Sequence, residues 1–344
     1  MRALVARPGE EHSTYVAEVD VPRGEGVLVR VLEVGVCGTD REISEGQFGD
    51  APEGTDELVI GHEMVGVVAR DGGGFAKGDL VSATVRRSCR HCLACEEGAP
   101  DSCLSGDYVE RGITRLDGFA REVVLEDADQ LVAIPRDLGR LGVLAEPTSI
   151  CARGVRHALA IGGRQPWRLR RALVIGAGPV GLLAAMLLRL QGVEVWAASL
   201  EEQSAVAEAL GARYVGMDAG NLSELGSFDL VVEAAGDAQL MAAALGLLRR
   251  GGVACLLGID GRDRKVEIDG PVLGMDTVLE NRVLFGSVNA HREDWLAGVT
   301  ALDRARTEFP GALERLVARR VPLDRFEDAF AFRGGKATLV LSDS

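Results

Sequence analysis

Apolar and polar positions alternate along the first third of the chain, in a pattern with a period of two. Residues 27–34 read Val-Leu-Val-Arg-Val-Leu-Glu-Val, and residues 58–60, 65–68 and 80–85 continue the pattern. This period is typical of β-strands that bury one face. A glycine-rich turn at 71–74 separates two of these strands. We therefore predict that the first part of the chain, about 135 residues, forms a β-rich domain.

The pattern changes near residue 145, after which apolar positions take the spacing of helices. Residues 147–161 and 179–191 have this spacing, and the apolar segment 171–175 between them is predicted to be a strand. Strands and Ala/Leu-rich helical stretches continue to alternate, with further strands predicted at 193–197, 228–234 and 253–257. This alternation predicts an α/β fold with a doubly wound parallel sheet. A last strand is predicted at 336–341, and the pattern leaves open which sheet it joins.

Composition narrows the classes of protein that fit this pattern. At 344 residues the chain is long enough for two domains. Its net charge of −14 argues against a nucleic-acid partner, because binding to phosphates needs a basic surface. No apolar run reaches the roughly 20 residues that span a bilayer, and residues 1–7 do not read as a signal peptide. We therefore expect a cytoplasmic protein that does not bind membranes.

Four of the seven cysteines form a cluster with regular spacing, at Cys89, Cys92, Cys95 and Cys103. Four thiolates at this spacing can surround one tetrahedral zinc ion, and ordinary free thiols are the alternative. The regularity of the spacing favours zinc. Four protein ligands would fill the coordination sphere, so this zinc would be structural and not catalytic. The clustering also fits a reducing compartment better than a disulfide scaffold.

A dinucleotide-binding motif, Gly176-x-Gly178-x-x-Gly181, follows a predicted strand and begins a predicted helix. The first glycine permits a tight turn, the second lets the backbone approach a pyrophosphate, and the third allows close packing of helix on strand. Pro179 and Val180 fill the positions before the third glycine, at the helix N-terminus where phosphates bind. A glycine-rich turn in an unrelated α/β protein is the alternative.

The end of the second nucleotide-binding strand favours NAD over NADP. Ser199, Leu200, Glu201 and Glu202 follow this strand, and we assign the first two to cofactor binding, with Ser199 facing the ribose. No arginine or lysine stands there to neutralise a 2′-phosphate, and the two glutamates would repel one. An acid directly at the strand end, which would bind the ribose of NAD, is absent as well.

A second metal site would have to be assembled from residues far apart in the sequence. Cys37, the adjacent pair His62 and Glu63, and Glu146 supply sulfur, nitrogen and oxygen donors. A catalytic zinc needs about three such ligands and one open position. Each residue alone is more often structural, since a buried cysteine usually acts as a small apolar side chain. Spacing cannot show whether the fold brings the four together.

The chain resembles the zinc-containing medium-chain alcohol dehydrogenase superfamily over essentially its full length. The motifs that carry this resemblance are Cys37-Gly-Thr-Asp40, Gly61-His-Glu-Met-Val-Gly66, the four-cysteine lobe, Glu146-Pro and Gly176-x-Gly-x-x-Gly181. Within the superfamily the chain is most similar to the glucose 1-dehydrogenases of archaea and some bacteria. The narrower motifs are Cys37-Gly-Thr-Asp-Arg-Glu-Ile43, Ala83-Thr-Val-Arg-Arg87, Tyr108-Val-Glu-Arg-Gly-Ile113 and Gly286-Ser-Val-Asn-Ala-His291.

The resemblance implies a division into two domains. Residues 1–150 and 292–344 would form a GroES-like β-barrel catalytic domain that carries the structural zinc lobe at 88–104. Residues 151–291 would form the Rossmann domain that binds NAD or NADP. Relatives are dimers or tetramers, which implies a homo-oligomer.

The resemblance also implies the ligands of the catalytic zinc, which would be the second zinc ion of each chain. Cys37 and His62 would be ligands, and Glu63 and Glu146 would be variable ligands that bind directly or through water. Thr39 would contact the reacting alcohol and begin the proton relay.

The substrate would be a sugar held by a further set of side chains. Glu110 and Asn289 match positions that bind sugar hydroxyls, His291 is a weaker candidate, and Thr39 and Glu146 lie on the substrate side of the zinc.

Two positions depart from common patterns of the superfamily. Glu42 stands where many members have a histidine of the proton relay, and Ser199-Leu200-Glu201 stands where several glucose dehydrogenases bind the 2′-phosphate.

The function that the resemblance implies is zinc-dependent oxidation of an aldose at C1 to the aldonolactone, with hydride transfer to NAD or NADP. D-glucose is the first expected substrate and D-galactose the second. A polyol or L-threonine dehydrogenase of the same superfamily is the alternative within enzymes. A redox-inactive NAD-binding protein is the alternative from another class, and intact Cys37, Thr39 and His62 argue against it.

Overall fold

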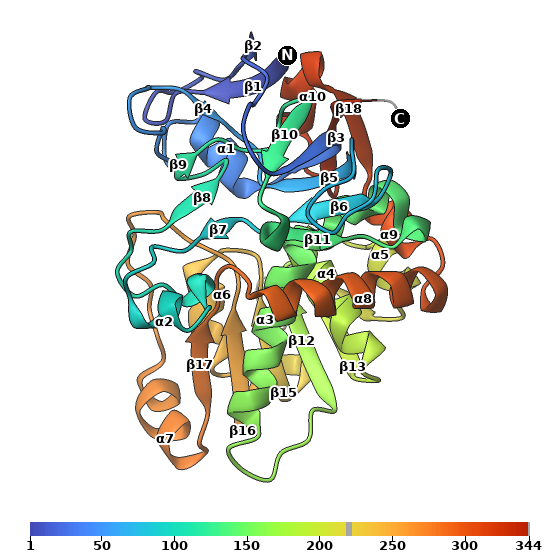
Figure 1. Cartoon of the computed structure of the whole chain (residues 1–344). Helices are drawn as coiled ribbons and strands as arrows, with labels where there is room; N and C mark the ends of the chain where they lie inside the picture. Colours follow the sequence, from blue (N-terminus) through green and yellow to red (C-terminus); the bar gives the residue numbers. More distant parts are fainter. Residues whose placement is uncertain (218–221, 343–344) are drawn as a thin grey trace. The chain divides into compact units, whose positions relative to one another are not determined.

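The computed structural model describes residues 1–217 and 222–342 and divides into two compact units (Figure 1). Unit 1 comprises Met1–Glu146, Asn289–Asp303 and Val317–Ser344, and unit 2 comprises Pro147–Val288 and Arg304–Leu316. The predicted division assigned the whole of 292–344 to one domain, whereas Arg304–Leu316 belongs to unit 2. This segment ends in helix α9 (Ala312–Leu316), whose Leu313 and Leu316 pack with Leu182 and Leu210 of unit 2.

The main sheet of unit 1 has seven strands and is built around the long strand β3. Its order is β11 (Leu131–Ala133), β6 (Leu80–Ala83), β5 (Glu63–Val68), β3 (Val27–Val36), β19 (Ala337–Val340) and β18 (Arg319–Pro322), with β10 (Val123–Glu126) also paired to β3. The strand left unassigned by the pattern, β19, is antiparallel to β3 and parallel to β18. Strand β19 therefore lies beside the segment that leads to Cys37.

Two smaller sheets and several short helices complete unit 1. The sheets are β2 (Tyr15–Glu18), β1 (Arg2–Ala6) and β4 (Leu58–Val59), and β7 (Arg86–Arg87), β8 (Val109–Arg111) and β9 (Arg115–Leu116). The helical segments are α1 (Gly38–Ser44), α2 (Leu93–Glu96), η1 (Pro100–Ser102), η2 (Ala128–Gln130), η3 (Arg136–Leu144), η6 (Leu323–Arg325) and α10 (Phe326–Ala331). The alternating pattern buries one side-chain set, including Leu4, Met64, Phe119 and Leu339, in one core. Burial of each such side chain contributes roughly 1.5–3 kcal/mol.

Unit 2 contains six parallel strands in the order expected of a doubly wound dinucleotide-binding sheet. The order is β14 (Arg213–Gly216), β13 (Glu194–Ser199), β12 (Arg171–Ile175), β15 (Phe228–Glu233), β16 (Leu248–Leu256) and β17 (Val283–Gly286). Its helical segments are α4 (Pro179–Leu190), α5 (Ala205–Ala209), η4 (Leu222–Leu225), α6 (Ala238–Ala244), η5 (Val272–Asp276), α7 (Thr277–Leu279) and α9. The predicted parallel sheet is thereby confirmed.

Two longer helices cross the unit boundaries given above. Helix α3 (Ala145–Gly162) begins with the last two residues of the first segment of unit 1, and α8 (Arg292–Glu308) ends in unit 2. Across residues 1–217 and 222–342, no helix combines the length and apolar character needed to cross a membrane.

Candidate active site

Cys37 and His62 meet where β3 ends and β5 begins. Cys37 caps α1, and its backbone N–H donates to Asp40 Oδ2 at 2.9 Å. His62 follows Gly61, whose φ of +89° permits the turn from β4. The His62 Nε2 atom lies 3.2 Å from Cys37 Sγ, and its Nδ1 atom lies 3.6 Å from Asp40 Oδ1. One ring nitrogen thus faces a sulfur donor while the other faces a carboxylate, which is the arrangement that orients a metal-binding histidine.

Asp40 and His62 are both buried, yet their surroundings stabilise the charged form of each. Burial acts to raise the pKa of Asp40, but His62 and the Cys37 N–H together hold that pKa below its usual value. Burial acts to lower the pKa of His62, whereas Cys37 and Asp40 raise it well above the usual value. The pocket therefore concentrates negative potential on the imidazole, as it would on a bound cation.

Glu63 points back across β3 to a lysine at the other end of the chain. Lys336 Nζ lies 2.7 Å from both carboxylate oxygens of Glu63, and each residue is 2 % exposed. Glu63 pairs in register with Gly35, where an added Cβ would lie 2.0 Å from Glu63 Oε2. Glycine at position 35 therefore makes room for this carboxylate, and Lys336 compensates its charge.

Glu146, near the start of α3, brings a second carboxyl group to the same place. The potential ligand atoms of His62, Glu63 and Glu146 all lie within 4.8 Å of one another, and Cys37, Asp40 and His62 form an overlapping group. Burial raises the pKa of Glu146 to about 8, although His62 acts in the opposite direction. Sulfur, imidazole and carboxylate donors held this closely fit a catalytic zinc ion.

The pKa of Glu146 makes the stability of the metal-free protein depend on pH. The folded state raises this pKa from 4.5 to about 8, so folding favours the protonated carboxyl group. We expect the free energy of unfolding to fall by up to roughly 4 kcal/mol as the pH rises through that interval. Urea unfolding of chelator-treated protein at pH 5, 6.5 and 8 measures the slope. The control variant Glu146→Gln should show a smaller slope, and equal slopes would contradict the assignment.

The four clustered cysteines come together in a lobe formed around α2 and η1. Their sulfur atoms all lie within 4.8 Å of one another. The Leu104 N–H, 3.3 Å from Cys92 Sγ, is the main cause that lowers the pKa of Cys92 to about 6. A thiolate at neutral pH is the form that binds metal. The donor set fits a closed tetrahedral zinc site.

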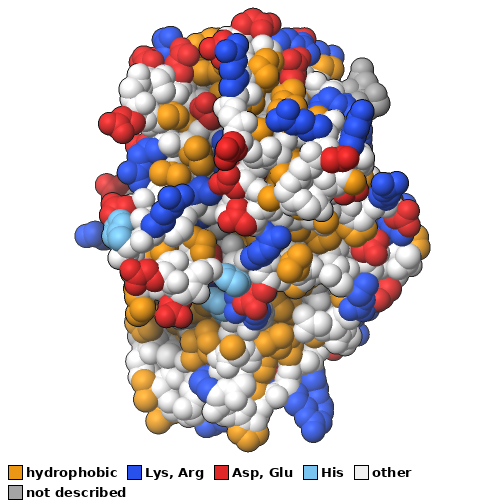
Figure 2. Space-filling view, in the orientation of Figure 1, with side chains coloured by type: hydrophobic (Ala, Val, Ile, Leu, Met, Phe, Trp, Pro, Cys, Tyr) orange, Lys and Arg blue, Asp and Glu red, His pale blue; other side chains and the backbone are white. Residues whose placement is uncertain are grey.

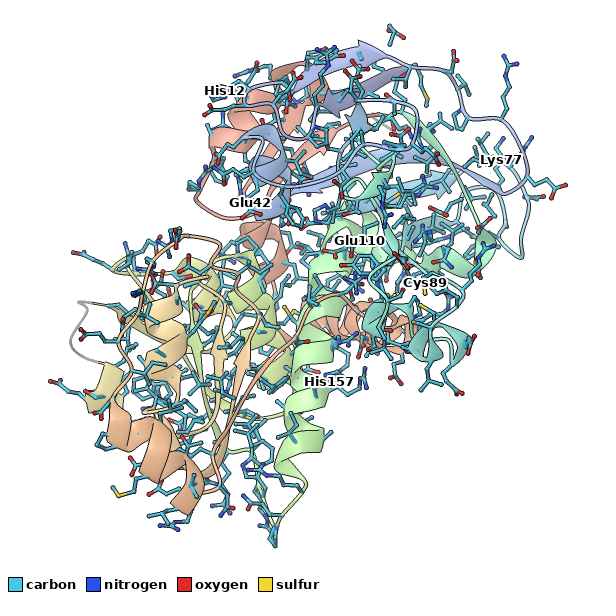
Figure 3. The ribbon with its side chains drawn as sticks, turned by 90° about the vertical axis from the view of Figure 1, so that its left-hand side faces the viewer. His12, Glu42, Lys77, Cys89, Glu110 and His157 are labelled. Atoms are coloured by element: carbon cyan, nitrogen blue, oxygen red, sulfur yellow. The ribbon has the colours of Figure 1, made fainter. Side chains whose placement is uncertain are left out.

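The predicted sugar-binding residues are partly brought together. Asn289 Nδ2 donates to Glu110 Oε1 at 2.8 Å, and Glu110 is labelled on its strand in Figure 3. His291 Nε2 faces Gly98 O at 3.2 Å, and its Nδ1 accepts from Glu293 N at 3.3 Å. Both ring nitrogens of His291 are thus engaged with the backbone, so this geometry favours the first two residues for sugar contacts.

Thr39 and Glu42 both lie on α1, close to the cluster in sequence. Thr39 is half-buried and stands between Cys37 and Asp40, the residues that meet His62. Glu42 is one turn further along α1 and is labelled in Figure 3. The helix therefore carries a hydroxyl residue two positions after Cys37 and next to Asp40 in sequence.

In unit 2, the glycine-rich segment connects β12 to α4. Gly176 has a φ of +98°, and an added Cβ there would lie 2.7 Å from Ala235 N. At Gly181 an added Cβ would lie 1.8 Å from Gly176 O, whereas at Gly178, the N-cap of α4, it would meet nothing within 4 Å. Gly176 and Gly181 thus allow close packing. Gly178, which Pro179 and Val180 follow, leaves space for a phosphate at the helix N-terminus.

The residues after β13 carry negative charge and no cation. Ser199 donates a hydrogen bond to the Glu201 carboxylate, and Leu200 is 79 % exposed. Tyr214 donates to Glu201 O at 2.9 Å. Arg213 on the neighbouring strand pairs in register with Trp196, at the opposite end from Ser199.

Three residues of unit 1 whose contacts form only in the fold were not recognised in the sequence: Gly35, Lys336 and Arg86, whose Nε donates to Glu110 Oε1 at 2.9 Å. Lys336 is one of only three lysines in an arginine-rich chain, which was the one available signal. Gly35 and Arg86 lie within quoted motifs or beside them, yet their contacts depend on the fold.

Comparison with known proteins identifies the family. Residues 23–136 match the alcohol dehydrogenase GroES-like domain, and residues 139–341 match the glucose dehydrogenase C-terminus. The chain therefore belongs to the zinc-containing medium-chain alcohol dehydrogenase superfamily, and within it to the glucose dehydrogenase family. The predicted resemblance and fold class are confirmed.

Several relatives are similar over nearly the whole chain. The glucose 1-dehydrogenase of Methanocella arvoryzae is 41% identical over 95% of both chains, and that of Thermoproteus tenax is 40% identical over 99% of both. A solved structure of Haloferax mediterranei glucose dehydrogenase in complex with NADP, Zn and gluconolactone is 33% identical. It covers 100% of each chain with a TM-score of 0.90.

Proposed function

We propose that this chain is a zinc-dependent glucose 1-dehydrogenase that transfers hydride to NAD or NADP. The observation that carries this proposal is the pair of donor groups that share His62, namely Cys37, Asp40 and His62 and the buried set His62, Glu63 and Glu146, in a chain 41% identical to a glucose 1-dehydrogenase. Oxidation at C1 removes a proton from the anomeric hydroxyl and a hydride from the carbon. The products are the aldonolactone, the reduced dinucleotide and one proton.

Different residues of the site would bind zinc, orient its ligands, transfer the proton and bind the two substrates. Cys37, His62 and one or both glutamates would hold zinc, which supplies Lewis acidity toward the anomeric oxygen. Asp40 orients His62, and Lys336 with Gly35 fixes Glu63. The hydroxyl of Thr39 would accept the anomeric proton as it releases its own, and the released proton reaches the solvent as the one proton among the products. Glu110 and Asn289 bind sugar hydroxyls, and Gly178 with the α4 N-terminus binds the pyrophosphate.

A panel of substrates tests the proposal. Zinc-loaded protein would be given D-glucose, D-galactose, D-xylose, sorbitol and L-threonine, each with NAD and with NADP. Fast reduction of the dinucleotide with an aldose supports the proposal. Turnover of sorbitol or L-threonine alone would keep the fold and the zinc chemistry and remove the sugar roles of Glu110 and Asn289. Absence of turnover in every case would favour a redox-inactive dinucleotide-binding protein.

We further infer that NAD is preferred, because the loop after β13 offers a 2′-phosphate only negative charge. Glu201 is held in place by Ser199 and Tyr214, so its carboxylate is a fixed repulsive group. We expect kcat/KM to be higher with NAD than with NADP. Glu201→Arg should raise kcat/KM with NADP by about 10-fold or more, since a charge-assisted hydrogen bond is worth about 1.5–3 kcal/mol. Steady-state kinetics with both dinucleotides decides, and a wild-type preference for NADP would refute the inference.

We also infer assembly into a homo-oligomer, a dimer or a tetramer, through unit 2. Apolar side chains are exposed along 273–288, including Val278 at 69 % and Leu279 at 64 %. Figure 2 shows apolar side chains spread over the visible surface of unit 2. Strand β17 pairs with β16 alone among the described residues, so one edge is open to a second copy. Light scattering should give a dimer or tetramer, and a monomer at micromolar concentration would contradict the inference.

The seven cysteines support a reducing location, which we infer to be the cytoplasm. All seven are free thiols, and four of them form the clustered lobe. Clustered thiols of this kind persist as metal ligands where disulfides do not form.

A further inference from the structure

Arg86, on β7, is a buried side chain held from three directions. Its Nε atom donates to Glu110 Oε1 at 2.9 Å, and its Nη1 atom donates to Asp101 O at 3.0 Å. The guanidinium carbon lies 3.7 Å from the centroid of the Tyr108 ring. The residue is 8 % exposed. A planar group that is stacked and bonded at two separate nitrogens has little freedom to turn.

Glu110 receives two donors on the same oxygen. Arg86 Nε and Asn289 Nδ2 both donate to Oε1, at 2.9 and 2.8 Å. Among the described residues, no hydrogen bond reaches Oε2. The two donors therefore fix the plane of the carboxylate and leave one oxygen as an acceptor of defined direction.

Asn289 is itself fixed by its backbone. Its φ of +63° is uncommon for a residue other than glycine, and its Oδ1 accepts from Ala290 N at 2.8 Å. The side-chain amide consequently presents Nδ2 to Glu110 in one orientation. Strain of this kind persists where surrounding contacts hold it, and it is concentrated at functional sites.

We propose that Arg86 is a positioning residue that aligns Glu110 Oε2 to accept a hydrogen bond from one sugar hydroxyl, and thereby sets discrimination between sugars. This inference rests on the proposed function. Because Asp101 lies in the cysteine lobe, between Cys95 and Cys103, Arg86 also ties the acceptor to that lobe. Without the guanidinium, the carboxylate would lose one of its two fixed donors and could rotate.

The variant Arg86→Lys tests the proposal, with Arg87→Lys as its matched control. A lysine keeps the charge but has one nitrogen, which cannot reach Glu110 and Asp101 O together as the guanidinium does. Arg87 is the next residue of β7, and it pairs instead with Glu126 Oε2 at 2.8 Å and Thr84 O at 2.7 Å. Each variant therefore disturbs a largely buried arginine, but only one disturbs Glu110.

The readout is kcat/KM for D-glucose divided by kcat/KM for each of its monodeoxy analogues. In the wild-type protein one analogue should react at least about 10-fold less well, because it lacks the hydroxyl that donates to Glu110. Arg86→Lys should lower that ratio about 10-fold, mainly through a higher KM for D-glucose with kcat little changed. Arg87→Lys should keep the wild-type ratio.

A second variant covers the case in which Arg86→Lys does not fold. Glu110→Gln keeps a carbonyl oxygen for the two donors and places an NH2 group where Oε2 was, which cannot accept a hydrogen bond. Glu110→Gln should lower the ratio of kcat/KM between D-glucose and the same monodeoxy analogue, as Arg86→Lys does. A wild-type ratio in either Arg86→Lys or Glu110→Gln overturns the proposal, as does an equal loss in Arg87→Lys. Failure of the wild-type protein to oxidise any aldose would instead overturn the proposed function.

Discussion

Replacement of Cys37 by alanine is expected to lower kcat with D-glucose by at least about a thousandfold, which corresponds to roughly 4 kcal/mol of lost transition-state stabilisation. The sulfur atom lies 3.2 Å from His62 Nε2 and is the softest donor of the two groups that share His62. Without it, His62 and two carboxyl groups would hold zinc weakly. Dinucleotide binding should stay unchanged, because the glycine-rich segment lies in unit 2. Zinc content, kcat and the dissociation constant for NAD measure the three effects.

The matched control for this variant is Cys255→Ala. Cys255 lies on β16, is 1 % exposed, and has its pKa raised to about 12 by burial, so it is a neutral apolar thiol. Its loss should reduce stability and leave kcat near the wild-type value. If Cys37→Ala retained kcat within about tenfold, the assignment of Cys37 to the catalytic metal would be wrong.

Replacement of Cys92 by serine should destabilise the cysteine lobe and remove one zinc ion per chain. The lobe contains short segments, α2 and η1, and exposes Leu93 and Leu104, so it has little apolar core of its own. Metal binding would therefore supply much of its folding free energy, which for structural zinc sites is on the order of 10 kcal/mol. We expect a lower melting temperature and increased cleavage within 88–104. Differential scanning fluorimetry, limited proteolysis and metal analysis measure these effects.

The control for the lobe is Leu93→Ala, which changes the same helix at a side chain that is 66 % exposed. It should leave zinc content and melting temperature close to those of the wild-type protein. Wild-type zinc content in Cys92→Ser would contradict the four-cysteine assignment.

The sequence predicted those parts of the fold whose signals come from residues close together along the chain. The strand periodicity, the glycine-rich turn and the cysteine cluster each lie within a short window, so residue spacing alone carries the information. The doubly wound sheet was predicted for the same reason. By contrast, the pattern at 336–341 did not show which strand would pair with β19.

Long-range contacts explain what the sequence did not reveal. Lys336 and Glu63 are 273 positions apart, and no periodicity connects them. The room that Gly35 leaves for Glu63 follows from strand register, which a one-residue shift would destroy. Similarly, the contact of Arg86 with Glu110 depends on the pairing of β7 with β8, which no local pattern predicts. Residue types marked Cys37, His62, Glu63 and Glu146 as candidate donors, but their spacing could not show that the fold brings them together.

The most direct test of the central claim is the fate of the C1 hydrogen of D-glucose. Zinc-loaded protein would be incubated with NAD and D-glucose deuterated at C1, and both products would be analysed by mass spectrometry and NMR. The account predicts one deuterium at C4 of the reduced nicotinamide and an unlabelled aldonolactone, with turnover lost in Cys37→Ala. Reduced dinucleotide without deuterium, or oxidation at another carbon of the sugar, would contradict it.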